Sequence, residues 1–185
     1  MMMYAIAIAV VLQINNVVGV PAMNIERAQQ EVTRLYRGIG VDVTWVSSDA
    51  PHAAALRAIR VVLVPYEGGD LRHREKPVMG AAVVTDQGTG IAYVFYRQIE
   101  SQARQYDVSA TMILASAISH EVAHLLLPDG QHSPDGLMRA CWTRDDFYRA
   151  EQGQLRFSTE QASLIRARAA LHPLVEHESR YRAGQ

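Results

Sequence analysis

Residues 110–130, which read ATMILASAISHEVAHLLLPDG, decide the fold of this chain of 185 residues. Asp107 or Ser109 can cap a helix that runs through this stretch, and Pro128 and Gly130 prevent its continuation. The predicted helix is apolar nearly all round, whereas a helix on the protein surface has a polar face. We therefore expect it to be buried against a sheet, with its few polar side chains inside the protein.

Five strands are predicted before this helix. Each is an apolar or alternating run bounded by turn residues. The run at residues 59–64 is largely β-branched, as in a central strand, and the last two runs form a hairpin or an edge strand beside a central strand. The five predicted strands are residues 1–12, 41–46, 59–64, 79–85 and 91–96.

Three further helical segments are predicted, two of them between strands and one after the long buried helix. Asn24 can cap a helix that Gly38 and Gly40 end, and Ser158 with Gln161 forms a capping box before a helix at residues 159–171. A short helix is expected at residues 53–58, and an exposed loop at residues 67–76. The order of elements is typical of one α/β domain.

The composition restricts the class of protein. The chain is 49% hydrophobic and 20% charged, which fits a single globular domain. Its formal net charge is −1 and its arginines are scattered along the chain, so we expect no nucleic acid as a partner. Cys141 is the only cysteine, which excludes an internal disulfide, and its place before Trp142 favours a small buried hydrophobe.

The apolar run at the start of the chain could be mistaken for a membrane span or a signal peptide. Residues 1–12 are too few to span a bilayer, which takes about 20 apolar residues. MMMY supplies no positive charge before the run, so a buried strand is favoured over a signal peptide. The compartment stays open between cytoplasm and export, and a monomer is the default expectation.

The segment HEVAH carries the chemistry. His120 and His124 stand four residues apart, so on a helix their imidazoles project from one face and can bind one metal ion. Neutral imidazole suits zinc, and Glu121 is placed to reach a water beside the metal as a general base. Two histidines satisfied by backbone carbonyls are the alternative, but a core of two imidazoles and a carboxylate without a metal would be costly to desolvate.

A third ligand is expected after the helix. The chain returns through a turn to His132, and three protein ligands with an open fourth position are typical of a catalytic zinc site. Asp129, Asp135 or Glu151 could substitute for His132. A site completed by Glu151 would resemble the gluzincins.

The segment HEVAHLLLPDGQHSPDGLM resembles the zinc signature and Met-turn of the metzincins, a group that includes the matrixins and archaemetzincins. The resemblance gives His120, His124 and His132 as metal ligands, Glu121 as the catalytic base and Met138 as the Met-turn methionine. Family members usually have glycine three residues after the second histidine. Here Leu127 holds that position and His132 arrives two residues late, so Gly130 would have to supply the turn.

The resemblance also implies a fold and a function. It implies a zincin-like α/β fold, with a mixed, mainly parallel five-stranded twisted sheet, an antiparallel edge strand, a backing helix and an active-site helix. Residues 1–127 would form the N-terminal part of one catalytic domain and residues 128–185 a small C-terminal subdomain. The implied activity is zinc-dependent endopeptidase, with one Zn²⁺ and a peptide or protein substrate. Four residues of the edge strand would bind that substrate: Gly80, Ala81, Ala82 and Val83.

Two other classes of function remain open. The chain could be a zinc-binding interaction module without catalysis, although such a module has no use for Glu121 beside the metal. It could also be a metallohydrolase that acts on a small amide. Arg139, Trp142 and Tyr148 could line the cleft, but a surface or core position is favoured for each of them.

Overall fold

The predicted buried helix is α3 (Ala110–Leu126) of the computed structural model. The structure describes residues 8–47, 58–66, 78–85, 90–130 and 132–171. Helix α3 follows Ser109, and twelve of its residues are buried, including His120 and Glu121. Its C-cap is Leu127, and the short 3-10 helix η2 (Pro128–Gly130) follows. The prediction of a buried helix that proline ends is confirmed.

The described strands form one five-stranded sheet of order β2-β1-β3-β5-β4. Three neighbouring pairs are parallel, and only β4 and β5 pair in the antiparallel sense. The prediction of a mainly parallel sheet with an antiparallel edge strand is therefore confirmed. The strands are β1 (Ala9–Asn16), β2 (Asp42–Val46), β3 (Ile59–Val64), β4 (Gly80–Val84) and β5 (Gly90–Phe95).

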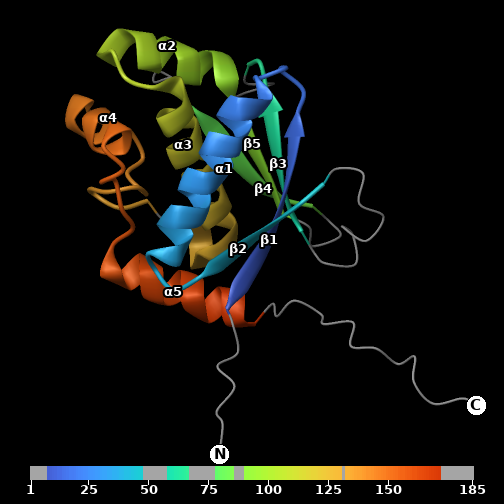
Figure 1. The fold of residues 1–185 in the computed structure, drawn as a ribbon. Coiled ribbons are helices and arrows are strands. Elements are labelled where there is room, and N and C mark those ends of the chain that lie inside the picture. The colour runs from blue at the N-terminus through green and yellow to red at the C-terminus, as the bar shows by residue number, and fades with distance from the viewer. Residues whose placement is uncertain (1–7, 48–57, 67–77, 86–89, 131, 172–185) are drawn as a thin grey trace, which may run out of the picture.

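Helices α1 (Ala22–Arg37) and α3 lie side by side on one face of the sheet (Figure 1). Helix α2 (Tyr96–Tyr106) lies at the top of the view and α5 (Thr159–Ala170) at the bottom, with α4 (Arg144–Glu151) on the far side of α3 from the sheet. Helix α3 contacts both β5 and β4, so its buried face is held directly over the antiparallel edge of the sheet.

One hydrophobic cluster runs through the described residues. It joins Leu12 of β1 and Tyr36 of α1 with Ile118 of α3 and Ile165 of α5. Met138, which follows η2, is fully buried in the same cluster. The core therefore includes residues on both sides of position 127, and α3 lies at its centre. Burial on this scale is the main contribution to the stability of the fold.

Strand β1 extends further than the sequence predicted. The first predicted strand ends at Leu12, but β1 continues through Gln13 to Asn16. Gln13 is 9% exposed and its amide donates a hydrogen bond to the Ser47 carbonyl, which satisfies a polar group inside the sheet. Asn16 accepts hydrogen bonds from the backbone N–H groups of Gly19 and Val20, so its side chain ends the strand in a turn.

Helices α1 and α2 (Tyr96–Tyr106) begin differently from what the sequence predicted. Pro21 and not Asn24 precedes α1, and no side chain caps this end of the helix. Tyr96 was predicted to end a strand but is the first residue of α2, an amphipathic helix that the sequence reading missed because the apolar run hid its start. The capping box of Ser158 and Gln161 is confirmed at α5.

Several predictions fall on other parts of the chain. Residues 53–57 of the predicted short helix, the predicted loop at residues 67–76 and the turn at residues 86–89 lie outside the described residues. So do residues 1–7, which belong to the predicted first strand.

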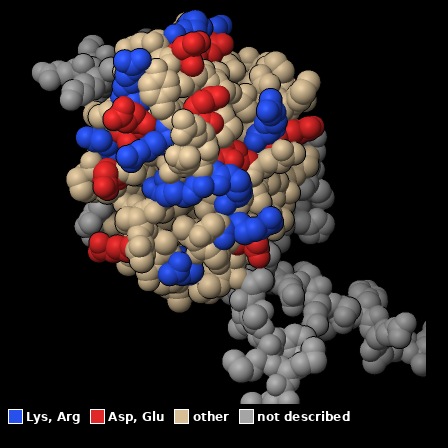
Figure 2. Space-filling model, turned by 60° about the vertical axis from the view of Figure 1, so that its left-hand side comes forward, with Lys and Arg blue, Asp and Glu red and all other residues tan. Residues whose placement is uncertain are grey.

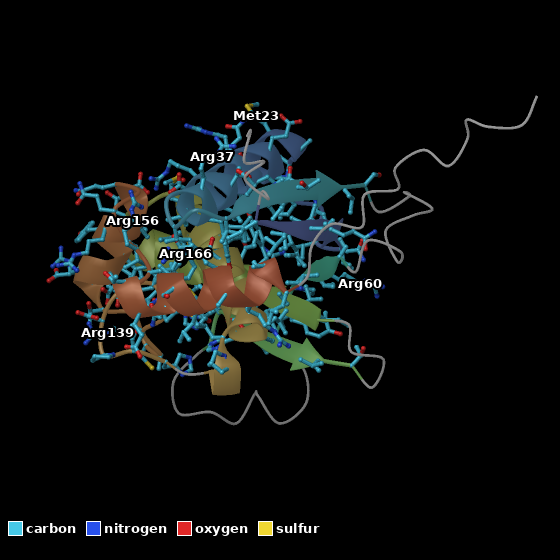
Figure 3. The ribbon with its side chains drawn as sticks, turned by 90° about the horizontal axis from the view of Figure 1, so that it is seen from below. Met23, Arg37, Arg60, Arg139, Arg156 and Arg166 are labelled. Atoms are coloured by element: carbon cyan, nitrogen blue, oxygen red, sulfur yellow. The ribbon has the colours of Figure 1, made fainter. Side chains whose placement is uncertain are left out.

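Charged side chains of both signs lie on one face of the molecule (Figure 2). On the face shown in Figure 2, basic and acidic residues are interspersed among uncharged ones. Figure 3 shows Arg139 and Arg156 at one side of the molecule and Arg60 at the opposite side. Among the described helices, none has the combined length and apolar character that crossing a membrane requires.

Candidate metal centre

His120 lies inside the molecule on α3, with 8% of its surface exposed. Its Nδ1 is 2.7 Å from the carbonyl oxygen of Leu137. A carbonyl can only accept, so Nδ1 carries the proton and donates it, and Nε2 is left with its lone pair. The backbone after the helix therefore fixes the tautomer of this imidazole.

His124 lies one turn further along α3 and is half-buried. Burial lowers the pKa of its imidazole, and an interaction with the backbone of Gly130 partly opposes this shift. Gly130 has a positive φ of 55°, so it supplies the turn that the sequence required of it. The Nε2 atom of His124 lies 2.9 Å from Nε2 of His120.

His132 completes the group from the loop after η2. Ligand atoms of His120, His124 and His132 all lie within 4.8 Å of one another. The ring centroid of His132 is 5.4 Å from that of His120 and 4.7 Å from that of His124. His132 is exposed, so the cluster opens from the buried helix toward solvent. The two additional residues of the turn do not prevent this convergence.

The arrangement fits a metal ion. Because Nδ1 of His120 carries the proton, the Nε2 lone pair of His120 faces Nε2 of His124 at 2.9 Å. A proton or a cation between these two nitrogens would satisfy that lone pair. Nitrogen atoms bound to one tetrahedral zinc at about 2.0–2.1 Å lie roughly 3.3 Å apart, and the ligand atoms of the three histidines lie within 4.8 Å of one another. The three histidines could therefore hold a divalent ion.

Burial keeps the two helix histidines neutral. It lowers the pKa of His120 to about 4, against the opposing effect of the Leu137 hydrogen bond. It also lowers the pKa of His124 to about 4, with a further contribution from His132. Only neutral imidazole binds a metal, so both side chains are ready to bind at neutral pH.

Glu121 is buried beside the histidines, with 6% of its surface exposed. Burial raises the pKa of its carboxyl group to about 8. A carboxyl group with a pKa near neutrality can both take up and release a proton, as a general base and acid must. A bound cation nearby would favour its charged form.

A cleft of about 900 Å³ runs past the histidines. Gly80, Ala81 and Ala82 of β4 line it together with Glu121, and Val83, whose side chain is 47% exposed, does not. Three of the four predicted substrate-binding residues thus lie on the cleft. The histidines, Glu121 and the edge of the sheet share one open space.

The loop after His132 supports the histidines through its backbone. Gly136 has a positive φ of 72°, and the N–H of Leu137 donates to the carbonyl of Arg156 at 2.8 Å. This turn presents the Leu137 carbonyl to His120. Met138 is fully buried next to it, at the position expected for a packing residue.

The sequence reading missed the role of Trp142. Its indole N–H donates to the Leu137 carbonyl at 3.2 Å, so this oxygen serves both Trp142 and His120. The Trp142 ring lies 6.2 Å from the His120 ring, and Trp142 and Arg139 both line the cleft. A backbone carbonyl leaves no sequence signal, so only the structure could reveal this link. Tyr148, in contrast, is not among the lining residues and bonds to Arg144.

Cys141 was predicted to be buried, and this is wrong. Its side chain is exposed and lines the cleft, because it lies on the loop that leaves the turn toward α4. Among the described residues it does not belong to the group that could hold a metal.

The alternative ligands do not join the described cluster. Glu151 accepts a hydrogen bond from the backbone N–H of Ser109 at 2.6 Å, at the start of α3. His120 is eleven residues further along the helix, about 16 Å away by helical rise. Asp135 is exposed and outside the cluster, and the side chain of Asp129 lies outside the part of the chain that is described.

Comparison with known proteins identifies no family. No protein-family model matches the sequence. No curated protein matches it either. The solution structure of TM1509 from Thermotoga maritima is similar with a TM-score of 0.35 and 10% sequence identity, over 93% of this chain and 99% of that chain. A likeness at this level carries no information on function.

Proposed function

We propose that this protein is a zinc-dependent endopeptidase with a zincin-like catalytic domain. The observation that supports the proposal is the convergence of His120, His124 and His132 beside the buried carboxyl group of Glu121 in one open cleft. Three imidazoles and an open side toward solvent are typical of catalytic zinc sites, whereas structural sites are closed by a fourth protein ligand. Met138 would be the Met-turn residue of this domain.

The residues of the chain would divide the work of peptide hydrolysis. Zinc, when bound, lowers the pKa of water and polarises a carbonyl. The three histidines would hold it, with His120 oriented through Nδ1 by the Leu137 carbonyl. Glu121 would accept a proton from the attacking water at a carboxylate oxygen and donate it to the leaving amine.

Strand β4 would bind the substrate backbone. It forms the edge of the sheet next to α3, and Gly80, Ala81 and Ala82 line the cleft. An extended peptide can add to such an edge by main-chain hydrogen bonds, with its scissile bond over the histidines. Small side chains on β4 leave room for this pairing.

The test combines metal analysis with a peptide library. We expect purified protein to hold about one zinc per chain and to cleave a mixed peptide library, with loss of cleavage in a chelator and recovery on adding zinc. Glu121→Gln should keep the metal and lose at least about a hundredfold in kcat. The matched control is Glu151→Gln, which removes a carboxylate remote from the cluster and should leave turnover unchanged.

The outcomes separate the alternatives. Full activity of Glu121→Gln would eliminate the proposed base. Zinc at one per chain without cleavage of any peptide would favour a binding module or a hydrolase of small amides. Absence of zinc binding would contradict the proposal as a whole.

A further inference from the structure

Glu121 is packed directly against the backbone of β4 at Gly80. A Cβ atom added to Gly80 would lie 2.5 Å from Cγ of Glu121 and 2.7 Å from both Cδ and Oε1. These three atoms are the nearest neighbours of that position. Real Cβ atoms do not approach other heavy atoms so closely, so any side chain at position 80 would displace the Glu121 carboxyl group.

The contact is specific to the outer part of the Glu121 side chain. The backbone of Gly80 pairs with β5 opposite Val94, and its φ lies outside the positive range that only glycine favours. Gly80 is the first residue of β4, and neither its strand pairing nor a positive φ requires glycine there. The close approach of the Glu121 side chain is the remaining requirement at this position.

We infer that Gly80 is a positioning residue for Glu121. Because position 80 has no side chain, β4 leaves a space, here called the seat, that holds the carboxyl group beside the three histidines. This inference rests on the proposed function for its catalytic consequence but not for its structural one. Glu121 leaves α3 toward the sheet, while His120 and His124 bind to the backbone of the loop after α3. Base and ligands are therefore positioned by different parts of the chain.

Because the base and the metal ligands are positioned by different parts of the chain, a substitution at Gly80 should affect the base and spare the ligands. Gly80→Ala should move the carboxyl group and leave the histidines in place, because no histidine atom is among the nearest neighbours of the added Cβ. Zinc affinity should stay within about twofold of the wild type. A displacement near 1 Å of a catalytic group costs about a hundredfold in rate. We expect kcat to fall by tenfold to a hundredfold with KM little changed.

A double-mutant cycle at positions 80 and 121, read out as Tm of the metal-free protein, tests the seat without any assay of activity. Gly80→Ala should lower Tm by several degrees in the wild type. In a Glu121→Ala background, which removes all three crowding atoms, the same substitution should leave Tm unchanged or raise it. In a Glu121→Gln background, which keeps the shape without the charge, the loss of Tm should persist.

Gly90→Ala is the matched control. Gly90 lies on β5, and a Cβ there would lie 2.9 Å from Leu125 of the same helix α3. This variant crowds the interface of sheet and helix at a flexible side chain and does not reach Glu121. Its effect on Tm should be the same in all three Glu121 backgrounds, and its kcat should match the wild type.

Each possible result of these experiments either supports the inference or overturns it. Coupling between positions 80 and 121 in the Tm cycle, with normal zinc affinity, supports the seat even if no peptide is cleaved, so its success is independent of the proposed activity. An equal loss of Tm from Gly80→Ala in the Glu121→Ala background would overturn it. Full kcat of Gly80→Ala in an active wild-type enzyme would overturn it as well.

Discussion

The Nε2 atoms of His120 and His124 lie 2.9 Å apart, while Nδ1 of His120 donates to the Leu137 carbonyl and His124 interacts with the backbone of Gly130. The pair is therefore oriented before any ligand binds. An oriented pair loses less conformational freedom on binding a metal than two mobile side chains would. The contribution of each imidazole can be tested singly.

Replacing any of the three histidines by alanine should weaken zinc binding by at least about a hundredfold, because each removes one of three ligands. Isothermal titration with zinc measures the affinity. Cys141→Ser provides the control, since Cys141 lines the same cleft but lies outside the cluster, and its affinity should equal that of the wild type. Unchanged affinity of His132→Ala would remove this residue from the site.

Trp142 offers an optical report of metal binding. Its ring is 6.2 Å from that of His120, whereas the other tryptophan, Trp45, bonds to Thr33 of α1. In a Trp45→Phe variant, titration with Co²⁺ should quench the remaining fluorescence at one equivalent, because a paramagnetic ion would lie next to the indole. The same titration of Trp45→Phe with His124→Ala should show no saturable quenching. Equal quenching in both proteins would contradict the position of the site.

Gly136 should be essential to the turn that supports His120. Alanine there meets a positive φ of 72° and a carbonyl oxygen of Arg156 only 2.8 Å from its Cβ. We expect Gly136→Ala to destabilise the protein by about 2–4 kcal/mol and to weaken zinc binding. Urea unfolding measures the stability. Gly19→Ala is the control, because Gly19 also has a positive φ of 78° but open space around it, and should cost about 1 kcal/mol without an effect on zinc.

The stability of the metal-free protein should depend on pH in two opposite ways. His120 and His124 have pKa values lowered from 6.5 to about 4, so the unfolded chain binds their protons first and their contribution to stability is lost as pH falls from 6.5 toward 4. Glu121 has its pKa raised from 4.5 to about 8, so its contribution is lost as pH rises through that range. Between pH 4.5 and 6.5 the two histidines outweigh the one glutamate, so stability rises with pH in this range. The stability of the metal-free protein should therefore be greatest near pH 6.5.

Calorimetric Tm values between pH 4.5 and 8.5 check this expectation. Glu121→Gln removes the group that titrates above pH 6.5, so the fall in Tm on the alkaline side should be smaller in this variant. Added zinc should move the maximum to higher pH, because it binds the neutral imidazoles. A wild-type Tm that rises steadily to pH 8.5 without metal would contradict the buried state of Glu121.

Much of the fold could be predicted from local patterns. The apolar character of α3, the β-branched run of β3 and the capping box of α5 each determine their element within a few residues. Helix α2 was missed because Tyr96 continues an apolar run in sequence but starts a helix in space. Gln13 misled the prediction of β1 because its partner, the Ser47 carbonyl, is 34 residues away.

The site was predictable only in part for the same reason. The spacing of His120, Glu121 and His124 is a property of one helix, so the sequence contains it. The Leu137 carbonyl and the seat at Gly80 depend on how the loop and β4 pack against that helix. Contacts of this kind involve backbone atoms or a missing side chain, which have no signature in a single sequence.

The most direct test of the central claim is the X-ray absorption spectrum of the zinc-loaded protein at the zinc edge. We predict three imidazole nitrogens at about 2.0–2.1 Å and one further light atom, without a sulfur shell at about 2.3 Å. The spectrum of His132→Ala should lose one imidazole. A wild-type spectrum with sulfur in the coordination shell, or with fewer than three imidazoles, would contradict a site built from His120, His124 and His132.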